Sequence, residues 1–230
     1  MSSPKLHSIE LAPDESKGRV SFSRPQLRAL PSKGPPTSQT QQFTNATVFF
    51  NGIGFCSLSE AVCAALLELY VPGYKVEPGK TFQVEVGSGR TVDFLIKGVL
   101  CEFHGIRLTP DRRGFGDFRD RAEFQSFRRE LRRVGRHRHR RRQLIQQTKA
   151  RLAELYFARR RSVIDSQPAY AACELIVATT VEQFYERIIV RFNKGPWPLR
   201  EDFVDSFYTL AGIIAKSNAS GRRSQRRRIA

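Results

Sequence analysis

Two carboxylates inside short apolar runs are the residues of this chain best suited to chemistry. The stretch 89–104 reads GRTVDFLIKGVLCEFH, with Asp93 in its first apolar run and Glu102 in its second. If Lys97-Gly98 is the tip of a β-hairpin, counting back along the two strands pairs Asp93 directly with Glu102. Directly opposed residues share a sheet face, with Cβ atoms ~5 Å apart. Like charges this close are destabilising unless a cation or a proton lies between them, so the pair predicts a divalent-metal site.

The strand that precedes this hairpin could extend the row of polar residues. Residues 81–86 alternate apolar and polar side chains and are followed by Gly87-Ser88-Gly89, which favours a strand and a turn. A three-residue loop would place Gln83 opposite Asp93, where it would hydrogen-bond near the carboxylates or lie on the surface. A two-residue loop would place Val84 there instead.

A helix should begin at a capping box upstream of these strands. Ser57 is expected at the N-cap and Glu60 at the third helical position, and Pro72-Gly73 should end the helix. Glu60 is therefore either a capping residue or a further acid of the site. The remaining elements are expected as a strand at 46–50, a basic helical region at 120–161, a buried strand at 173–178, an amphipathic helix at 181–192 and a last helix at 201–215.

The chain carries a formal net charge of +17, and its excess positive charge is confined to three regions. Residues 128–142 hold nine Arg and one Glu, the tail from 216 to 228 adds six cations, and residues 1–42 contribute +3. The two remaining stretches, 43–127 and 143–215, sum to zero. Such clustering predicts a polyanionic partner recruited by appended basic segments.

The arginines of residues 128–142 are the candidate nucleic-acid contacts. So many like charges without compensating acids would repel one another, which favours a phosphate-backbone partner over a merely solvated helix face. The run also fits a nuclear-localisation pattern, and His137 and His139 are not expected to bind metal among so many cations. The candidate contacts are Arg128, Arg129, Arg132, Arg133, Arg136, Arg138, Arg140, Arg141 and Arg142.

The order of helix, three strands, helix, strand and helix, together with its motifs, resembles the PD-(D/E)XK nuclease superfamily. The similarity covers roughly residues 55–192 and is greatest to the very-short-patch-repair-like endonucleases. It implies an α/β, restriction-endonuclease-like core, a mixed central sheet flanked by helices, at residues 43–215. The residues that carry the similarity are Ser59-Glu60, Phe82-Gln83, Thr91-Val92-Asp93-Phe94 and Leu100-Cys101-Glu102-Phe103-His104.

The resemblance implies Mg²⁺- or Mn²⁺-dependent phosphodiester hydrolysis, with DNA as the expected substrate. Asp93, Glu102 and Glu60 would bind the metal ion, since hard carboxylate oxygens suit Mg²⁺ or Mn²⁺. His104 stands where the family motif usually has Lys, and a neutral imidazole could act there as a general base or a metal ligand. Lys80 or Lys97 would then supply the missing positive charge.

Composition sets further bounds on class and location. The four cysteines show no metal-binding spacing and no apolar run approaches the ~18 residues of a membrane span, so a reduced cytoplasmic protein is expected. Association with the nucleoid stays open. Residues 1–42 and 216–230 are expected to be disordered basic tails, with an Arg-rich helical insertion at about 120–145. Two alternatives to a nuclease are a catalytically degenerate nucleic-acid-binding protein and an assembly factor for a ribonucleoprotein. Homo-oligomer formation stays open.

Overall fold

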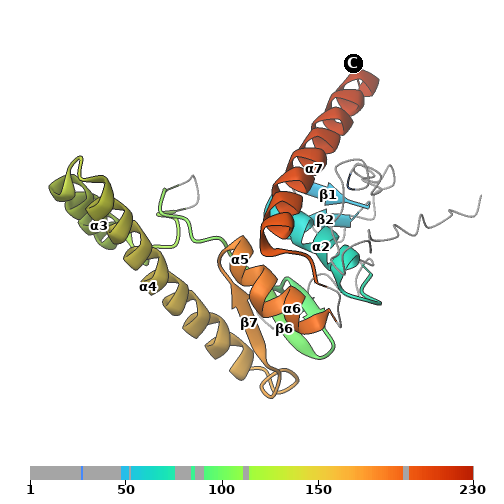
Figure 1. The fold of residues 1–230 in the computed structure, drawn as a ribbon, viewed down its shortest axis with the longest axis horizontal. Helices are drawn as coiled ribbons and strands as arrows, with labels where there is room; N and C mark the ends of the chain where they lie inside the picture. Colours follow the sequence, from blue (N-terminus) through green and yellow to red (C-terminus); the bar gives the residue numbers. More distant parts are fainter. Residues whose placement is uncertain are drawn as a thin grey trace, which may run out of the picture. The chain divides into compact units, whose positions relative to one another are not determined.

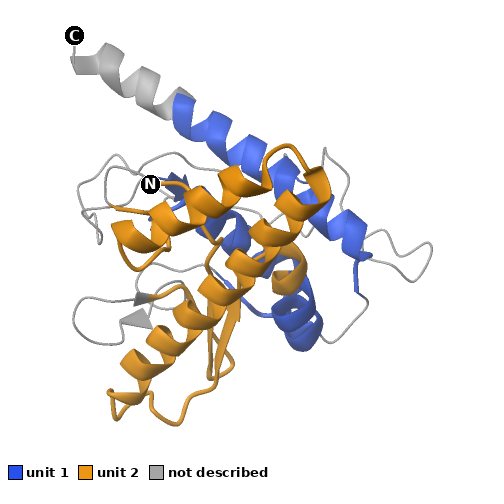
Figure 2. Ribbon diagram, turned by 90° about the vertical axis from the view of Figure 1, so that its left-hand side faces the viewer, with its two compact units in different colours: residues 1–82, 185–230 blue, residues 83–184 orange. Residues whose placement is uncertain are grey.

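In the computed structural model, the chain folds into small β-sheets flanked by helices, a mixed α/β arrangement (Figure 1). The predicted α/β class is thereby confirmed, and the restriction-endonuclease-like core stays a prediction. The chain divides into two compact units (Figure 2): unit 1 comprises residues 1–82 and 185–230, and unit 2 comprises residues 83–184. The structure describes residues 27, 48–51, 53–75, 84–85, 91–110, 114–193 and 197–229, with side chains described except at 84, 85, 91 and beyond 219.

Unit 2 is built on a three-stranded sheet with the order β5–β6–β7. β5 pairs with β6 in an antiparallel hairpin whose turn residues, Lys97 and Gly98, have φ values of 49° and 81°. Positive φ at both positions is the geometry that two-residue hairpin turns favour. The hairpin predicted around Lys97-Gly98 is therefore confirmed, and β6 then pairs with β7 in parallel. The strands are β5 (Phe94–Ile96), β6 (Val99–Phe103) and β7 (Leu175–Ala178).

A second antiparallel pair, β3 (Val84–Glu85) and β4 (Thr91–Val92), precedes this hairpin. Val84 lies opposite Val92, which is the register expected for a three-residue loop rather than a two-residue one. Gln83 and the loop itself lie outside the described residues. Only Asp93, in a bend, separates β4 from β5.

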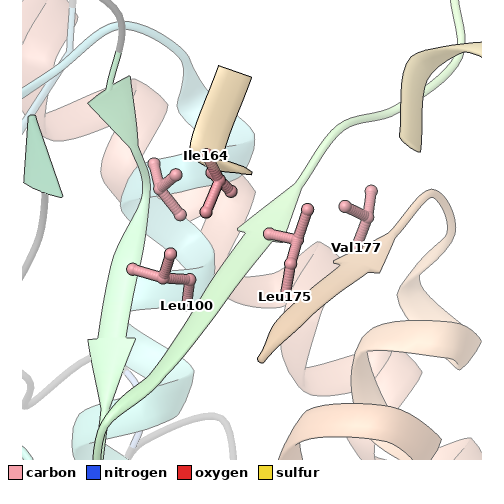
Figure 3. Packing of buried hydrophobic residues seen from close by; sticks show 5 residues of the cluster. Leu100, Ile164, Leu175 and Val177 are labelled. Carbon is pink, nitrogen blue, oxygen red and sulfur yellow. The ribbon is translucent and has the colours of Figure 1, made fainter. Parts of the chain in front are cut away.

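One face of the three-stranded sheet packs against the C-terminal half of α4 (Arg138–Asp165). Leu100, Leu175 and Val177 from the strands and Ile164 from α4 form a buried apolar cluster, shown in Figure 3. All of them are less than a tenth exposed, and burying such a side chain contributes about 1.5–3 kcal/mol. This packing fixes the C-terminal half of α4 over the strand that carries Glu102.

The other face of the sheet packs against α5 (Val181–Phe184). The ring of Phe184 contacts Phe94 at a centroid distance of 6.4 Å and Phe103 at 5.8 Å, both in edge-to-face geometry. The sheet is thus covered on both faces, which explains why its strands have nearly continuous apolar sequences.

A helical hairpin extends unit 2, formed by α3 (Arg121–Val134) and the N-terminal half of α4, which lie side by side (Figure 1). We call residues 121–151 the arm. The sequence predicts one helical region over 120–161, whereas the structure breaks it at Gly135, which has a φ of 59°. Glycine adopts this conformation readily, and a glycine with positive φ commonly follows the end of a helix.

Unit 1 consists of a β-hairpin, helix α2 and the long helix α7. The side chain of Asn218 on α7 accepts a hydrogen bond from Phe49 N at 2.9 Å and donates one to Phe49 O at 2.9 Å, which ties β1 to α7. α7 also continues as a helix through the stretch 216–229, which the sequence predicts as a disordered tail. The elements are β1 (Val48–Phe50), β2 (Ile53–Phe55), α2 (Leu58–Tyr70), the π-helix η1 (Tyr185–Ile189), α6 (Val190–Phe192) and α7 (Arg200–Ile229).

The predicted helix at 181–192 is helical throughout, but it includes the π-helical turn η1 between α5 and α6. None of the helices in the described parts of the chain is long and apolar enough to cross a membrane.

Candidate active site and nucleic-acid-binding arm

Asp93 is buried at the bend between β4 and β5, with 8% of its surface exposed. Its Oδ2 atom accepts a hydrogen bond from the backbone N–H of Phe103 at 2.9 Å. This bond joins the two strands of the hairpin just beyond their last backbone pair, Phe94 with Cys101. The ladder ends at that pair and Asp93 lies in the bend that follows it, so the direct pairing of Asp93 with Glu102 stays a prediction.

Glu102 is buried on β6, with 4% of its surface exposed, and both of its carboxylate oxygens have partners. Oε1 accepts a hydrogen bond from the hydroxyl of Tyr156, and Oε2 accepts one from Nε of Arg160 at 2.7 Å. Tyr156 and Arg160 are one helical turn apart on α4, so they present their side chains to the same place. The cation that a buried carboxylate requires is here a guanidinium.

Both carboxylates lie close enough to Arg160 to influence its charge. Burial opposes the charge of Arg160, yet Glu102 and, to a smaller extent, Asp93 raise the pKa of its guanidinium above the ordinary value. Burial first, and then Glu102, also raises the pKa of Tyr156 far above its usual range, so its hydroxyl stays protonated and donates to Glu102.

A histidine–aspartate pair lies beside these groups. His104 directly follows β6, and its Nε2 atom lies 2.8 Å from Oδ1 of Asp117. The imidazole also stacks on the ring of Tyr156, with centroids 3.8 Å apart and planes within 5° of parallel. Tyr156 therefore contacts His104 through its ring and Glu102 through its hydroxyl.

Asp117 is ionised and fixes the proton position on His104. Burial alone would raise the pKa of Asp117, but hydrogen bonds from the His104 imidazole and the Arg107 backbone N–H lower it below its ordinary value. An ionised carboxylate only accepts hydrogen bonds, so Nε2 of His104 carries a proton and donates it to Oδ1 of Asp117.

A close backbone contact at Gly116 returns the loop to the end of β6. Gly116 has a φ of 68°, and a Cβ atom at this position would lie 2.4 Å from the carbonyl oxygen of Arg107. Only glycine fits without a shift of the backbone, and the contact places Asp117 next to Arg107 and His104.

The other predicted site residues are distributed as follows. Glu60 belongs to unit 1 and caps α2: its Oε2 accepts a hydrogen bond from Cys56 N at 3.2 Å, and its backbone N–H donates to Ser57 Oγ at 3.1 Å. The capping box is thus confirmed, while a metal-binding role for Glu60 stays a prediction. Gln83 and Lys80 lie outside the described residues. Lys97 is exposed at the hairpin turn.

Sequence reasoning did not predict the contacts that Tyr156, Arg160 and Asp117 make with Glu102 and His104. The spacing of Tyr156 and Arg160 within the predicted helical region 120–161 would place both on one helix face, which is the signal that could have indicated them. No pattern distinguishes Asp117 within its glycine- and arginine-rich loop, because its position depends on the backbone contact at Gly116.

The donor atoms of the carboxylate pair suit a hard divalent cation, but the pair already has other partners. Oxygen ligands from Asp93 and Glu102 match the preference of Mg²⁺ or Mn²⁺. Within the described ranges, no cluster of three or more His, Cys, Asp or Glu side chains could hold a metal ion. The two carboxylates therefore fit a metal ion if Glu102 exchanges Arg160 for it.

The nine arginines predicted to bind nucleic acid are all exposed on the arm. Those from Arg138 to Arg142 lie at the N-terminal end of α4, which has no acidic residue in its first turn. The helix dipole makes this end electropositive, so cations are unfavourable here for folding. In contrast, Arg132 and Arg133 lie in the last turn of α3, where the dipole favours cations.

Comparison of the chain with protein-family models, with curated proteins and with solved structures gives no match in any of the three. The resemblance to PD-(D/E)XK nucleases therefore stays an expectation from the sequence.

Proposed function

We propose that the protein is a Mg²⁺- or Mn²⁺-dependent nuclease that hydrolyses phosphodiester bonds of DNA. The observation that carries the proposal is a buried pair of carboxylates, Asp93 and Glu102, next to a histidine whose proton position is fixed by an aspartate. Buried acids with charged partners and an oriented imidazole are typical of catalytic sites. Such groups would have little reason to gather on a purely structural sheet.

In this proposal, Asp93 and Glu102 hold the metal ion and His104 acts as the general base. The bound ion supplies Lewis-acid chemistry, because it neutralises charge on the phosphate and on the leaving oxygen. Nδ1 of His104 accepts the proton of the attacking water, while Asp117 stabilises the imidazolium that forms. Tyr156 keeps the imidazole plane next to the acid pair by stacking on it.

The arm is the proposed contact for the nucleic-acid backbone. The arginines at the start of α4 are unfavourable for the free protein, because they repel one another and oppose the helix dipole. Binding of a polyanion would offset both the mutual repulsion and the effect of the helix dipole. We therefore attribute these arginines to an anionic partner rather than to the stability of the free protein. Contacts of this kind bind phosphates without reading the base sequence.

We further propose that the arm binds duplex rather than single-stranded DNA. Proteins that bind single strands place exposed aromatic rings for base stacking next to their basic residues. The phenylalanines of the arm, Phe124 and Phe127, are both buried, so no phenylalanine, tyrosine or tryptophan ring of the arm is exposed for base stacking. With DNA as the partner, the proposed location is the cytoplasm, in contact with the nucleoid.

The experiment that tests this function is plasmid cleavage by the purified chain. Supercoiled plasmid should be nicked or cut with Mg²⁺ or Mn²⁺ and left intact with a chelator. Asp93→Asn, which keeps the size of the side chain, should abolish cleavage while retaining DNA affinity. Asp205→Asn, the same change at an exposed position of α7, serves as the control and should cleave like the wild type.

A second candidate function is a nucleic-acid-binding protein without catalysis. The interaction of Glu102 with both Tyr156 and Arg160 favours it, because these bonds already satisfy the carboxylate without a metal ion. This candidate predicts DNA binding that is indifferent to divalent ions and no cleavage under any condition.

A further inference from the structure

The contact between Arg160 and Glu102 brings a cation from α4 onto the proposed metal ligand. The two side chains are 12% and 5% exposed, so this is a largely buried ion pair rather than a surface one. Removing one partner of a buried pair leaves an uncompensated charge, which makes such contacts costly to lose. Arg160 is thus a necessary part of the site in its present state.

The charges of Asp93, Glu102 and Arg160 show how a divalent ion would change the attraction of the site for a phosphate. Asp93 and Glu102 together carry two negative charges, and Arg160 returns one positive charge. The group is therefore net negative and repels a phosphate. A divalent cation held by the two carboxylates would add two positive charges to this group, which favours the binding of a phosphate.

We propose that Arg160 is a positioning residue that holds Glu102 until a divalent cation takes its place, and that the released guanidinium then binds the phosphate of the DNA. This inference rests on the proposed nuclease function. A guanidinium binds phosphate through two parallel hydrogen bonds, a geometry that an ammonium does not match.

The structure offers Arg160 another contact once Glu102 is occupied. Its guanidinium carbon lies 6.0 Å from the centroid of the Tyr156 ring, at the outer limit of a cation–π contact. Tyr156 could retain the released side chain near the site while the phosphate binds. Arg160 would supply the positive charge that the sequence analysis assigned to Lys80 or Lys97.

Metal affinity tests the first half of the proposal without requiring activity. Binding of Mn²⁺ alone is measured by calorimetry for the wild type, Arg160→Gln and Arg159→Gln. Arg159 is exposed one residue away on α4, so its variant removes the same charge without touching Glu102. Arg160→Gln should bind Mn²⁺ at least about tenfold more tightly, and Arg159→Gln should bind like the wild type. Equal affinity of Arg160→Gln and the wild type would overturn the proposal.

Two additional variants keep the test conclusive if Arg160→Gln folds poorly. Arg160→Lys retains the charge but lacks the Nε donor of the 2.7 Å bond to Glu102, so it should gain Mn²⁺ affinity by a smaller factor. The double variant Glu102→Gln with Arg160→Gln leaves no uncompensated charge at position 102 and should lose the gained affinity. A gain that persists in the double variant would also overturn the proposal.

Metal-promoted DNA binding tests the second half. Affinity for a duplex is compared in chelator and in Ca²⁺, an ion that also takes oxygen ligands. The wild type should bind more tightly with Ca²⁺, and Arg160→Gln should lose most of this gain. An undiminished gain in Arg160→Gln would show that the guanidinium does not contact phosphate.

The outcomes separate this inference from the proposed function. If the wild type never cleaves but Arg160→Gln gains Mn²⁺ affinity, the nuclease function fails and the exchange at Glu102 stands. If the wild type cleaves but Arg160→Gln binds Mn²⁺ no better, the function stands and the exchange is wrong.

Discussion

At Glu102, the chemistry depends on how one buried carboxylate is shared among its partners. Tyr156 and Arg160 satisfy its two oxygens, and Tyr156 also stacks on His104. Each of these side chains thus serves both the stability of the sheet face and the geometry of the proposed site. Substitutions that remove one atom at a time can separate these roles.

Tyr156→Phe should lower the free energy of unfolding by about 2 kcal/mol, because it removes a hydrogen bond to a buried carboxylate. The stacking on His104 is retained in this variant. Tyr170→Phe is the matched control, since Tyr170 packs against the same apolar cluster. Urea denaturation of both variants is the measurement, and an equal loss in the two would contradict the assigned role of the Tyr156 hydroxyl.

Asp117→Asn should show that the carboxylate of Asp117 stabilises the protein in a pH-dependent manner. The pKa of Asp117 is lowered from its ordinary value of 3.8 in the folded protein, so its contribution is present above this pH and is lost as the pH falls through the folded pKa. The difference in the free energy of unfolding between the wild type and Asp117→Asn should therefore be constant above about pH 5 and shrink below about pH 4. Denaturation midpoints from pH 7 to pH 3 would check this, and a difference that grows below pH 4 would refute it.

Among the elements, the β5–β6 hairpin could be predicted from sequence because local rules determine it. Lys97-Gly98 sets the turn, and the apolar runs on either side set the register. The break at Gly135 was missed because the arginine-rich sequence around it favours helix on both sides. The approach of α4 to Glu102 was also missed, since it depends on packing between residues more than fifty positions apart.

Gly135→Ala should destabilise the arm, because an L-residue at this positive φ is strained by about 1–2 kcal/mol. The space itself is open, with no atom closer than 3.9 Å to an added Cβ, so strain rather than a clash is responsible. Gly212→Ala, on an exposed position of α7, should have the opposite sign and stabilise by about 0.5–1 kcal/mol. Thermal denaturation of the two variants tests this difference, and a shift of the same sign in both would contradict it.

Across the whole molecule, the excess positive charge lies on other segments than the strands of the proposed site. The formal charge of +17 is carried by the arm and the chain ends, while the strands that hold the acids are nearly neutral in sequence. Composition alone predicted this division. It could not predict that the arm and the partners of Glu102 share one helix, α4, which joins both functions in unit 2.

Replacing four arginines at the start of α4 by Gln should raise the melting temperature while it weakens DNA binding. Both effects follow from the removal of cations that oppose the helix dipole and contact phosphates. The slope of log affinity against log salt should flatten by up to about 0.9 for each lost contact. Four Gln substitutions in α7 are the charge-matched control and should weaken binding less. The substituted residues are Arg138, Arg140, Arg141 and Arg142 on the arm and Arg222, Arg223, Arg226 and Arg227 in α7.

An equal loss of affinity in the two sets would contradict the arm as the principal DNA contact. A lower melting temperature of the arm variant would contradict the electrostatic explanation for its arginines.

The most direct test of the central claim is nicking of supercoiled plasmid by the wild type and by Asp93→Asn in Mn²⁺. Asp93 suits this comparison, because its carboxylate accepts a hydrogen bond from the backbone N–H of Phe103 and the amide oxygen of Asp93→Asn can accept the same bond. We expect nicking by the wild type, none by Asp93→Asn, and none by either in chelator. Nicking by Asp93→Asn at the wild-type rate would contradict the assignment of this carboxylate pair as the catalytic centre.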